Sequence, residues 1–299
     1  MAEAERNFMN LLKARWAESK FLCVGLDSAT ARLPTHLQNR EVIGACDAQL
    51  VFNKAIIDAT HDLVCAYKPN LAFYAPGNGA YVLRDTVRYI NNVAPGVPVI
   101  LDAKWGDIGN TNNGYINHLR WYGADAVTIN PYVGAEVESK DGVQPFLDLA
   151  DKGVVVLCKT SNRGSGQFQD SVVEIPEEHG LGRLLVPQGP LYEKVARTVA
   201  NEWNDNHNCG LVVGATYPEL VGEIREAAGD GVYLLLPGVG SQGGKAGNVV
   251  QAAADSSGQG FMINNGSAIL FASSGEDFAE AARAKAEANN DEILAALAA

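Results

Sequence analysis

The segment VILDAKWGDIGNTNNGYINHLRWYG, residues 99–123, displays the repeating unit of the fold. It begins with a short apolar run that leads into charged residues, and residues 111–123 then have the apolar spacing of a helix. Near-continuous apolar strands are typical of parallel sheets that are covered on both faces. The segment therefore predicts one buried β-strand followed by one covering helix.

The same alternation recurs on both sides of this segment. Seven further apolar runs predict strands at 21–27, 65–70, 126–130, 154–160, 211–216, 233–239 and 261–266. Further helices are predicted at 1–20, 48–64, 81–93, 143–153, 190–204, 217–229, 243–254 and 277–288. Eight strand–helix units predict an α/β fold, a single (β/α)8 barrel domain over 1–299. The polar, glycine-rich stretch at about 161–190 lacks periodicity, which favours a functional lid.

Composition excludes several classes of protein. With 47% hydrophobic and 19% charged residues, the chain is not intrinsically disordered. A net charge of −12 argues against general nucleic-acid binding, because such a surface repels phosphodiester backbones. The absence of a long apolar run and of a signal-peptide pattern predicts no membrane span and a cytoplasmic location. The five cysteines form no CxxC pair and the five histidines no ligand pair, so we expect no metal site.

Polar residues stand where the predicted strands end. In a (β/α)8 barrel, the carboxyl ends of the strands face the active site, whereas the amino ends serve stability. The unusual polar residues at these ends are Asp27, Lys68, Asn70, Asp102, Lys104, Lys159 and Gln242. The sequence therefore predicts a charged site at one mouth of the barrel.

The charges of the 99–111 segment are the most informative of these residues. Asp102 and Lys104 are two positions apart on a strand, so we expect both to face the barrel interior. Lys68 can meet Asp102 from the neighbouring strand, and Asp107 follows in the loop. Buried charges are costly unless each is paired, which predicts an alternating row of the four. A purely structural ion-pair network is the alternative interpretation.

These residues resemble the orotidine 5′-phosphate decarboxylase family. The likeness rests on DAKWGDIGNT at 102–111 and runs nearly end to end. The other matching segments, in order, are CVGLD at 23–27, KPNLAFY at 68–74, KTSN at 159–162, VVGAT at 212–216 and PGVGSQGG at 237–244. The long segment after KTSN resembles the larger-bodied branch of the family.

The resemblance implies decarboxylation of orotidine 5′-monophosphate to uridine 5′-monophosphate, in pyrimidine biosynthesis, without metal or organic cofactor. Lys104 would protonate C6, Asp102 would crowd the departing carboxylate, and Lys68 would hold Asp102 and the ribose. The site would lie at a homodimer interface, with Asp107 and Thr111 reaching the partner's site. The other residues that the resemblance assigns to the substrate are Asp27, Asn70, Ile108, Ser161, Pro237, Gly238, Gly240, Gln242, Gly266 and Ser267.

The phosphate-binding segment departs from the family pattern. INNGSAI at 263–269 has Ser267 where the family usually has an arginine that clamps the phosphate. A neutral hydroxyl in place of a forked cation weakens phosphate binding. An engineered substitution, a cation supplied by Arg163 or Lys245, and a weakened activity are all compatible with this serine. On this basis a Ser267→Arg change is expected to tighten substrate binding.

Two other functions share these sequence features. A sugar-phosphate decarboxylase on the same barrel would need Mg²⁺, for which Glu136 and Glu138 are the nearby ligand candidates. A nucleotide-binding barrel without turnover is the second alternative. Loss of orotidylate absorbance, measured with and without a chelator, separates the three.

Overall fold

The computed structural model describes residues 6–38, 45–74, 78–174, 188–215, 218–238 and 246–299. Parallel strands form a nearly closed barrel within them, in the order β2-β1-β12-β11-β10-β7-β4-β3. Their bounds are β1 Leu22–Gly25, β2 Ala66–Lys68, β3 Ile100–Trp105, β4 Ala126–Ile129, β7 Gly153–Lys159, β10 Cys209–Val213, β11 Tyr233–Pro237 and β12 Phe261–Asn265. Single bridges, Tyr67 to Val99 and Asn70 to Asp102, join β2 to β3. The predicted (β/α)8 barrel is confirmed, and all eight predicted strands are present.

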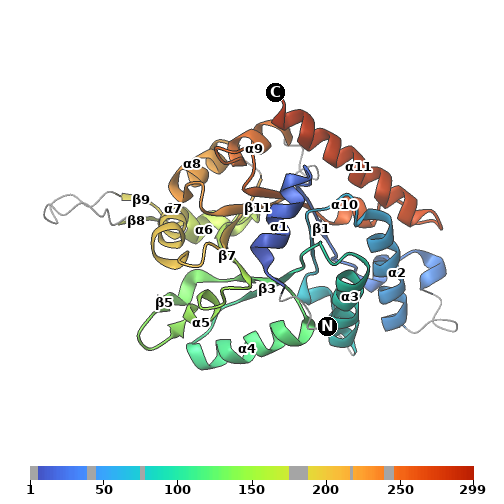
Figure 1. Cartoon of the computed structure of the whole chain (residues 1–299), viewed down its shortest axis with the longest axis horizontal. Helices are drawn as coiled ribbons and strands as arrows, with labels where there is room; N and C mark the ends of the chain where they lie inside the picture. The colour runs from blue at the N-terminus through green and yellow to red at the C-terminus, as the bar shows by residue number, and fades with distance from the viewer. Residues whose placement is uncertain (1–5, 39–44, 75–77, 175–187, 216–217, 239–245) are drawn as a thin grey trace, which may run out of the picture.

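Helices surround the strands (Figure 1). They are α1 Phe8–Ala17, α2 Ala45–Thr60, α3 Gly79–Val93, α4 Gly109–Tyr122, α5 Gln144–Leu147, α6 Gly166–Gln169, α7 Leu191–Thr198, α8 Pro218–Ala228, α9 Ala246–Ala253, α10 Ser267–Leu270 and α11 Phe278–Leu297. The strands are buried because the helices cover their outer faces, as expected for a parallel sheet. None of the helices in the described ranges is long and apolar enough to cross a bilayer.

Helix α1 covers the amino-terminal ends of the strands and crosses in front of them in Figure 1. Its Phe8 is fully buried and lies 5.6 Å, ring to ring, from Tyr233 at the start of β11. Gly153 makes room for this contact, since a Cβ there would lie 2.3 Å from the Phe8 ring. Trp16 donates a 2.9 Å hydrogen bond to the carbonyl of Phe261, at the start of β12. The predicted N-terminal helix thus covers the amino-terminal end of the barrel.

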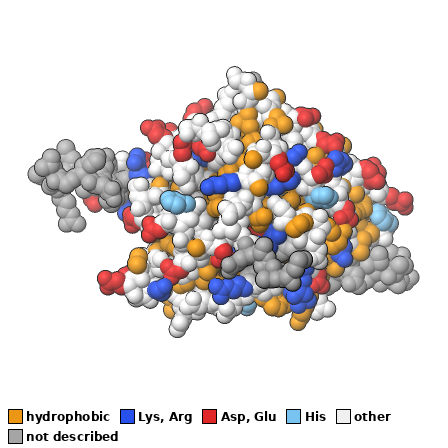
Figure 2. Space-filling model, viewed as in Figure 1, with side chains coloured by type: hydrophobic (Ala, Val, Ile, Leu, Met, Phe, Trp, Pro, Cys, Tyr) orange, Lys and Arg blue, Asp and Glu red, His pale blue; other side chains and the backbone are white. Residues whose placement is uncertain are grey.

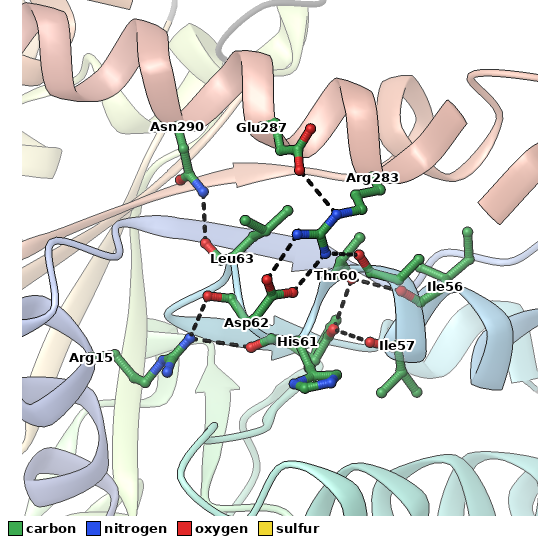
Figure 3. Close-up of polar contacts among 12 residues, drawn as sticks. Arg15, Ile56, Ile57, Thr60, His61, Asp62, Leu63, Arg283, Glu287 and Asn290 are labelled. Carbon is green, nitrogen blue, oxygen red and sulfur yellow. Dashed lines mark hydrogen bonds and ion pairs between the residues drawn. The ribbon is translucent and has the colours of Figure 1, made fainter. Parts of the chain in front are cut away.

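The C-terminal helix α11 is fixed to the end of α2 by polar contacts (Figure 3). Arg283 donates to both carboxylate oxygens of Asp62, at 2.8 and 2.9 Å, and pairs with Glu287 one turn along. Asn290 donates to the carbonyl of Leu63 at 2.8 Å. Acidic side chains are prominent along the edge of the molecule that α11 forms (Figure 2), in keeping with the negative net charge.

Three segments differ from the sequence prediction. The helix predicted at 143–153 is only the four residues of α5, because asparagine side chains from elsewhere bind the carbonyls that follow it. The helix predicted at 190–204 changes at residue 199 from α7 into a π-helical segment, η6 (Val199–Trp203). The stretch predicted as an aperiodic lid carries a 3₁₀ turn, η5 (Arg163–Ser165), helix α6, and the paired strands β8 (Val172–Glu174) and β9 (Gln188–Pro190). Residues 175–187 of that stretch lie outside the described residues.

Candidate active site

Asp102 is the centre of a charged cluster at the carboxyl ends of β2, β3 and β4. One of its carboxylate oxygens accepts from Lys68 Nζ at 2.7 Å, and the other from Lys104 Nζ at 2.5 Å. Thr128 of β4 donates its hydroxyl to the second oxygen at 3.0 Å. Lys68 and Asp102 are buried, whereas the side chain of Lys104 remains 47% exposed. The structure therefore brings together three of the four charges that the sequence placed in one row.

The backbone of β3 is irregular where it carries these charges. Its pairing with β4 shifts register between Leu101 and Trp105, and Lys104 has a φ of 54°. The Thr128 hydroxyl oxygen accepts hydrogen bonds from the amides of Ala103 and Lys104, at 3.0 and 2.9 Å. A left-handed backbone is unfavourable for a lysine and persists only where its surroundings enforce it. The proximity of Asp102 and Lys104 was predicted from simple strand alternation, whereas in the structure β3 is irregular at these residues.

The cluster fixes the charge states of its buried members. Burial by itself raises the pKa of Asp102, but the two ammonium groups outweigh it and hold that pKa at about 2. Burial by itself lowers the pKa of Lys68, but Asp102 and Asp27 outweigh it and hold that pKa above its usual value. At neutral pH the site therefore presents a carboxylate between two ammonium groups, of which the Lys104 ammonium is open to solvent.

Two buried oxygens near this cluster find no hydrogen-bond donor among the described residues. They are Oδ1 of Asp27, which follows β1, and Oδ1 of Asn264, at the end of β12. Burial raises the pKa of Asp27 above its usual value, although Lys68 acts in the opposite direction. An unpaired buried acceptor carries the full cost of its lost hydration. These oxygens are suited to accept hydrogen bonds from a ligand that carries hydroxyl or amide donors.

Asp107 does not join the charged cluster of its own chain. Its carboxylate accepts instead from the amide of Ile108 at 2.7 Å, in the loop between β3 and α4. Ile108 is 60% exposed, and Thr111 lies exposed in the first turn of α4. The loop packs against the small hairpin of β5 (Ala135–Glu136) and β6 (Asp141–Gly142), since Gly109 donates its amide to Asp141 at 2.6 Å. None of these three predicted site residues hydrogen-bonds to or pairs with Asp102.

Most other predicted site residues lie at the same mouth of the barrel. Asn70 donates to Asp102 at 3.4 Å. Ser161 follows β7 and lies directly against the backbone of Gly214, which follows β10. Pro237 ends β11, and Gly238 after it has a φ of 98°. Gly266 and Ser267 follow β12, and a Cβ on Gly266 would lie 3.5 Å from Asp27. Gly240 and Gln242 lie outside the described residues.

Lys159, another polar residue at a strand end, supports the segment that follows β7. Its ammonium pairs with Asp170 at 2.5 Å and lies 5.8 Å from the centre of the Tyr192 ring. The amide of Thr160 donates to the side chain of Gln169 at 2.9 Å. This bond joins the end of β7 to helix α6, in the first part of the predicted lid.

Sequence reasoning missed three residues of this mouth: Thr128, Asn264 and Arg32. A signal exists for the first two, because each is a polar residue inside an otherwise apolar strand. Arg32 belongs to the 3₁₀ turn η1 (Thr30–Arg32) after β1, and its guanidinium donates to the Ser267 hydroxyl at 3.2 Å. Nothing in the sequence pairs these two residues, which are 235 positions apart.

The chain is similar to known proteins over nearly its whole length. The family model described as "Orotidine 5'-phosphate decarboxylase / HUMPS family" matches residues 20–284. A curated relative named orotidine 5′-phosphate decarboxylase, from Azoarcus sp. (strain BH72), is 45% identical over 97% of this chain and 99% of its own. That of Cellvibrio japonicus is 42% identical over 98% of this chain and all of its own length.

Solved structures agree with the sequence matches. Leishmania donovani OMP decarboxylase superposes with a TM-score of 0.76 at 33% identity, covering 98% of this chain and 99% of that chain. Leishmania donovani UMP synthase superposes with a TM-score of 0.77 at 34% identity. The present chain spans 57% of the length of that UMP synthase.

Proposed function

The chain belongs to the orotidine 5′-phosphate decarboxylase / HUMPS family, and from this premise we propose that it converts orotidine 5′-monophosphate to uridine 5′-monophosphate and carbon dioxide. The observation that carries the proposal is the Lys68–Asp102–Lys104 cluster, in which one buried carboxylate holds two ammonium groups at the mouth of the barrel. Relatives that share its length carry this name, which supports the assignment.

The cluster suits a reaction that leaves an electron pair on carbon. When the bond between C6 and the carboxylate carbon breaks, carbon dioxide leaves and the pair stays on C6, where the pyrimidine ring delocalises it poorly. An ammonium group held nearby stabilises that charge and then supplies a proton to C6. Lys104 is suited to this role because Asp102 fixes its Nζ while 47% of its side chain remains exposed.

The neighbouring groups have supporting roles. Asp102 raises the pKa of Lys68 and holds both lysines in place, and its negative charge repels a substrate carboxylate that bonding to C6 holds close. Lys68 neutralises Asp102 and lies toward Asp27. Asp27 and Asn264 offer unpaired buried oxygens to the hydroxyl groups of a ribose. Binding of the distant phosphate by residues after β11 and β12 contributes free energy that orients C6.

We also propose that the active form is a homodimer in which Asp107 and Thr111 act in the partner's site. The support is that Asp107 binds the amide of Ile108 rather than a group of the charged cluster, in a loop that exposes the apolar side chain of Ile108. Ile108 lies on the β3–α4 loop, Val137 in the hairpin turn, and Tyr132 and Val133 in the 3₁₀ turn η4 (Pro131–Val133) just before that hairpin; all four are between 43% and 88% exposed. Exposed apolar side chains that gather in this way are typical of a protein interface.

A mixed-dimer experiment tests that arrangement. Lys104→Ala and Asp107→Ala are each expected to be nearly inactive alone. If Asp107 serves the partner's site, a heterodimer of the two variants has one intact site, so random mixing restores about a quarter of the wild-type activity. If Asp107 serves its own site, no heterodimer has an intact site and mixing restores nothing. Sedimentation measures the oligomeric state directly, and a monomer at assay concentration would contradict the proposal.

Turnover itself is tested by following the loss of orotidylate absorbance with purified protein, with and without a chelator. Loss at the same rate in both conditions is expected. Turnover that the chelator abolishes would favour a magnesium-dependent reaction on this barrel. Tight nucleotide binding without turnover would favour a binding protein. Glu136, a magnesium-ligand candidate from the sequence, instead accepts hydrogen bonds from Glu138 and Ser139 in its own hairpin turn.

The remaining expectations are that the predicted lid closes over the bound nucleotide and that the protein acts in the cytoplasm. The contacts of Lys159 with Asp170 and of Thr160 with Gln169 support the location of this segment, because they fix its start at the carboxyl end of β7, the end of the barrel that carries the charged cluster. A reducing compartment suits Cys23, Cys65, Cys158 and Cys209, which are buried and free.

A further inference from the structure

At one corner of the barrel, formed by the residues where β11 and β12 end, neither strand contains a lysine or an arginine. Pro237, Gly238, Gly266 and Ser267 are neutral, although barrels of this type commonly bind phosphate at this corner. A phosphate dianion is bound most strongly by a forked guanidinium. Arg163, one cation suggested by the sequence, is exposed in η5 after β7. Lys245, the other, lies outside the described residues.

Arg32 reaches this corner from the η1 turn after β1, the strand that pairs with β12. Its Nη1 donates to the hydroxyl of Ser267 at 3.2 Å, and its guanidinium lies 3.9 Å from the centre of the Phe271 ring. Within the described ranges, no other lysine or arginine hydrogen-bonds to or stacks on this corner. We infer that Arg32 is the cation that binds the substrate phosphate, with Ser267 as its hydrogen-bonding partner.

The position of Arg32 is set by the packing of its turn. The η1 turn follows Ser28, whose carbonyl and hydroxyl oxygens both accept from Gln49, at 2.8 and 3.2 Å. Leu33, directly after the turn, is buried in the core. The side chain of Arg32 is exposed, and no carboxylate of the described residues lies within ion-pair distance of it. A guanidinium that is oriented but not neutralised is ready to bind an anion.

The Arg32–Ser267 contact also gives a reason for a serine at position 267. Ser267 Oγ accepts a hydrogen bond from Arg32, and its own hydroxyl hydrogen is then available to donate to a phosphate oxygen. The stacked ring of Phe271 restricts the guanidinium, so less rotamer freedom is lost when the anion binds. The Arg32–Ser267 pair thus supplies both a charge and a neutral donor. With that cation in place, Ser267→Arg is expected to gain little, contrary to the expectation from sequence alone.

Because the inference rests on the proposed function, its test separates phosphate binding from turnover. The probes are uridine 5′-monophosphate and uridine, whose affinities are measured by calorimetry on the full-length protein. Arg32→Ala is expected to weaken binding of the nucleotide by roughly tenfold to hundredfold and to leave uridine binding unchanged. Arg88→Ala, an exposed arginine on α3, is the matched control for loss of one positive charge and is expected to change neither affinity.

A charge-relocation cycle sharpens the test. Adding Ser267→Arg to Arg32→Ala is expected to restore most of the nucleotide affinity, whereas Ser267→Arg alone changes it by less than about threefold. For turnover, Arg32→Ala is expected to raise KM for orotidine 5′-monophosphate more than it lowers kcat. Equal losses for uridine and its monophosphate, or unchanged nucleotide affinity, would overturn the inference. If Arg32→Ala weakens binding of the nucleotide but not of uridine, and the wild type shows no decarboxylation, the proposed function fails and the role of Arg32 remains.

Discussion

The two ends of the barrel bury charge in different ways. At the amino-terminal end, Arg225 donates to the carbonyls of Gly229, Val232, Ala253 and Gly260, so its donors are bound by backbone. At the carboxyl-terminal end, charges bind one another, and the buried Oδ1 of Asp27 finds no donor in the described ranges.

Asp125 completes the comparison at the amino-terminal end. Its carboxylate accepts from Arg6 at 2.8 and 2.9 Å and from the amide of Val99 at 2.9 Å. The buried charges of Arg225 and Asp125 are thus bound within the chain and serve folding. The carboxyl-terminal end retains unsatisfied groups, and their cost is offset when a ligand binds. Substitutions at the two ends should therefore separate stability from activity.

The largest expected effect is on turnover. Lys104→Ala removes the proposed proton donor, so kcat/KM for orotidine 5′-monophosphate should fall by at least about 10³-fold. The fold should persist, because the side chain is half exposed. Stopped-flow or absorbance assays measure the rate and thermal melting measures the fold. Lys13→Ala, an exposed lysine on α1 at the opposite end, should keep full activity. Substantial activity in Lys104→Ala would exclude Lys104 as the proton donor.

The largest expected effect on stability is at the other end. Arg225→Ala leaves buried carbonyls without a donor, and the free energy of unfolding should fall by about 3–4 kcal/mol. Urea unfolding followed by far-ultraviolet circular dichroism gives this value. Folded Arg225→Ala should bind uridine 5′-monophosphate with wild-type affinity. A loss of affinity without a loss of stability would contradict the division between the two ends.

The Asp102 carboxylate should stabilise the fold in a pH-dependent way. Its pKa in the folded protein, about 2, lies below its unfolded value, so its contribution is complete above about pH 4 and is lost as pH falls toward 2. That contribution is roughly 2 kcal/mol. Urea unfolding of the wild type and of Asp102→Asn, measured across this range, should show a difference that shrinks with acid. A difference that is independent of pH would contradict the pairing.

Asp27 should show the opposite sign. Because its pKa is raised in the folded protein, its charged form destabilises the fold at neutral pH, and the penalty disappears in acid. Asp27→Asn should therefore raise the free energy of unfolding at pH 7 while weakening nucleotide binding. Calorimetric melting and binding measure the two effects. If Asp27→Asn is less stable than the wild type at pH 7, the Asp27 carboxylate makes stabilising interactions in the folded protein, which would contradict this prediction.

The smallest expected effect lies outside both ends. Arg283→Ala removes a half-exposed contact between α11 and the end of α2 (Figure 3), so the free energy of unfolding should fall by only about 0.5 kcal/mol. Activity should be unchanged. A loss comparable to that of Arg225→Ala would mean that exposure is a poor guide to the strength of these contacts.

The strands were predictable because burial on both faces requires a continuous run of apolar residues, which is visible in the local sequence. The run around Val154–Val156 is apolar at consecutive positions, which only a covered strand requires. The helix predicted over 143–153 failed for a nonlocal reason. Asn206 donates to the carbonyl of Leu147, and Asn208 donates to those of Leu149 and Lys152, each at 2.7 Å. Residues about 60 positions away thus replace the helical hydrogen bonds.

The site was partly predictable for a similar reason. Lys68, Asp102 and Lys104 are charged residues at the ends of apolar strands, where a charge needs a partner, so their proximity was expected. Thr128 was not identified, because a threonine within a strand is common. The Arg32–Ser267 contact required the closed barrel, which places the turn after the first strand beside the helix that follows the last.

The sequence by itself determined the eight strands, the end of the barrel that carries charge, and the identity of the central carboxylate and its two lysines. These follow from local rules of burial and pairing. Only the tertiary structure decided the left-handed backbone at Lys104, the separation of Asp107 from the charged cluster, and the arginine beside Ser267. Each of these depends on closing the sheet into a barrel, because closure brings together groups that are far apart along the chain and have no local preference for one another.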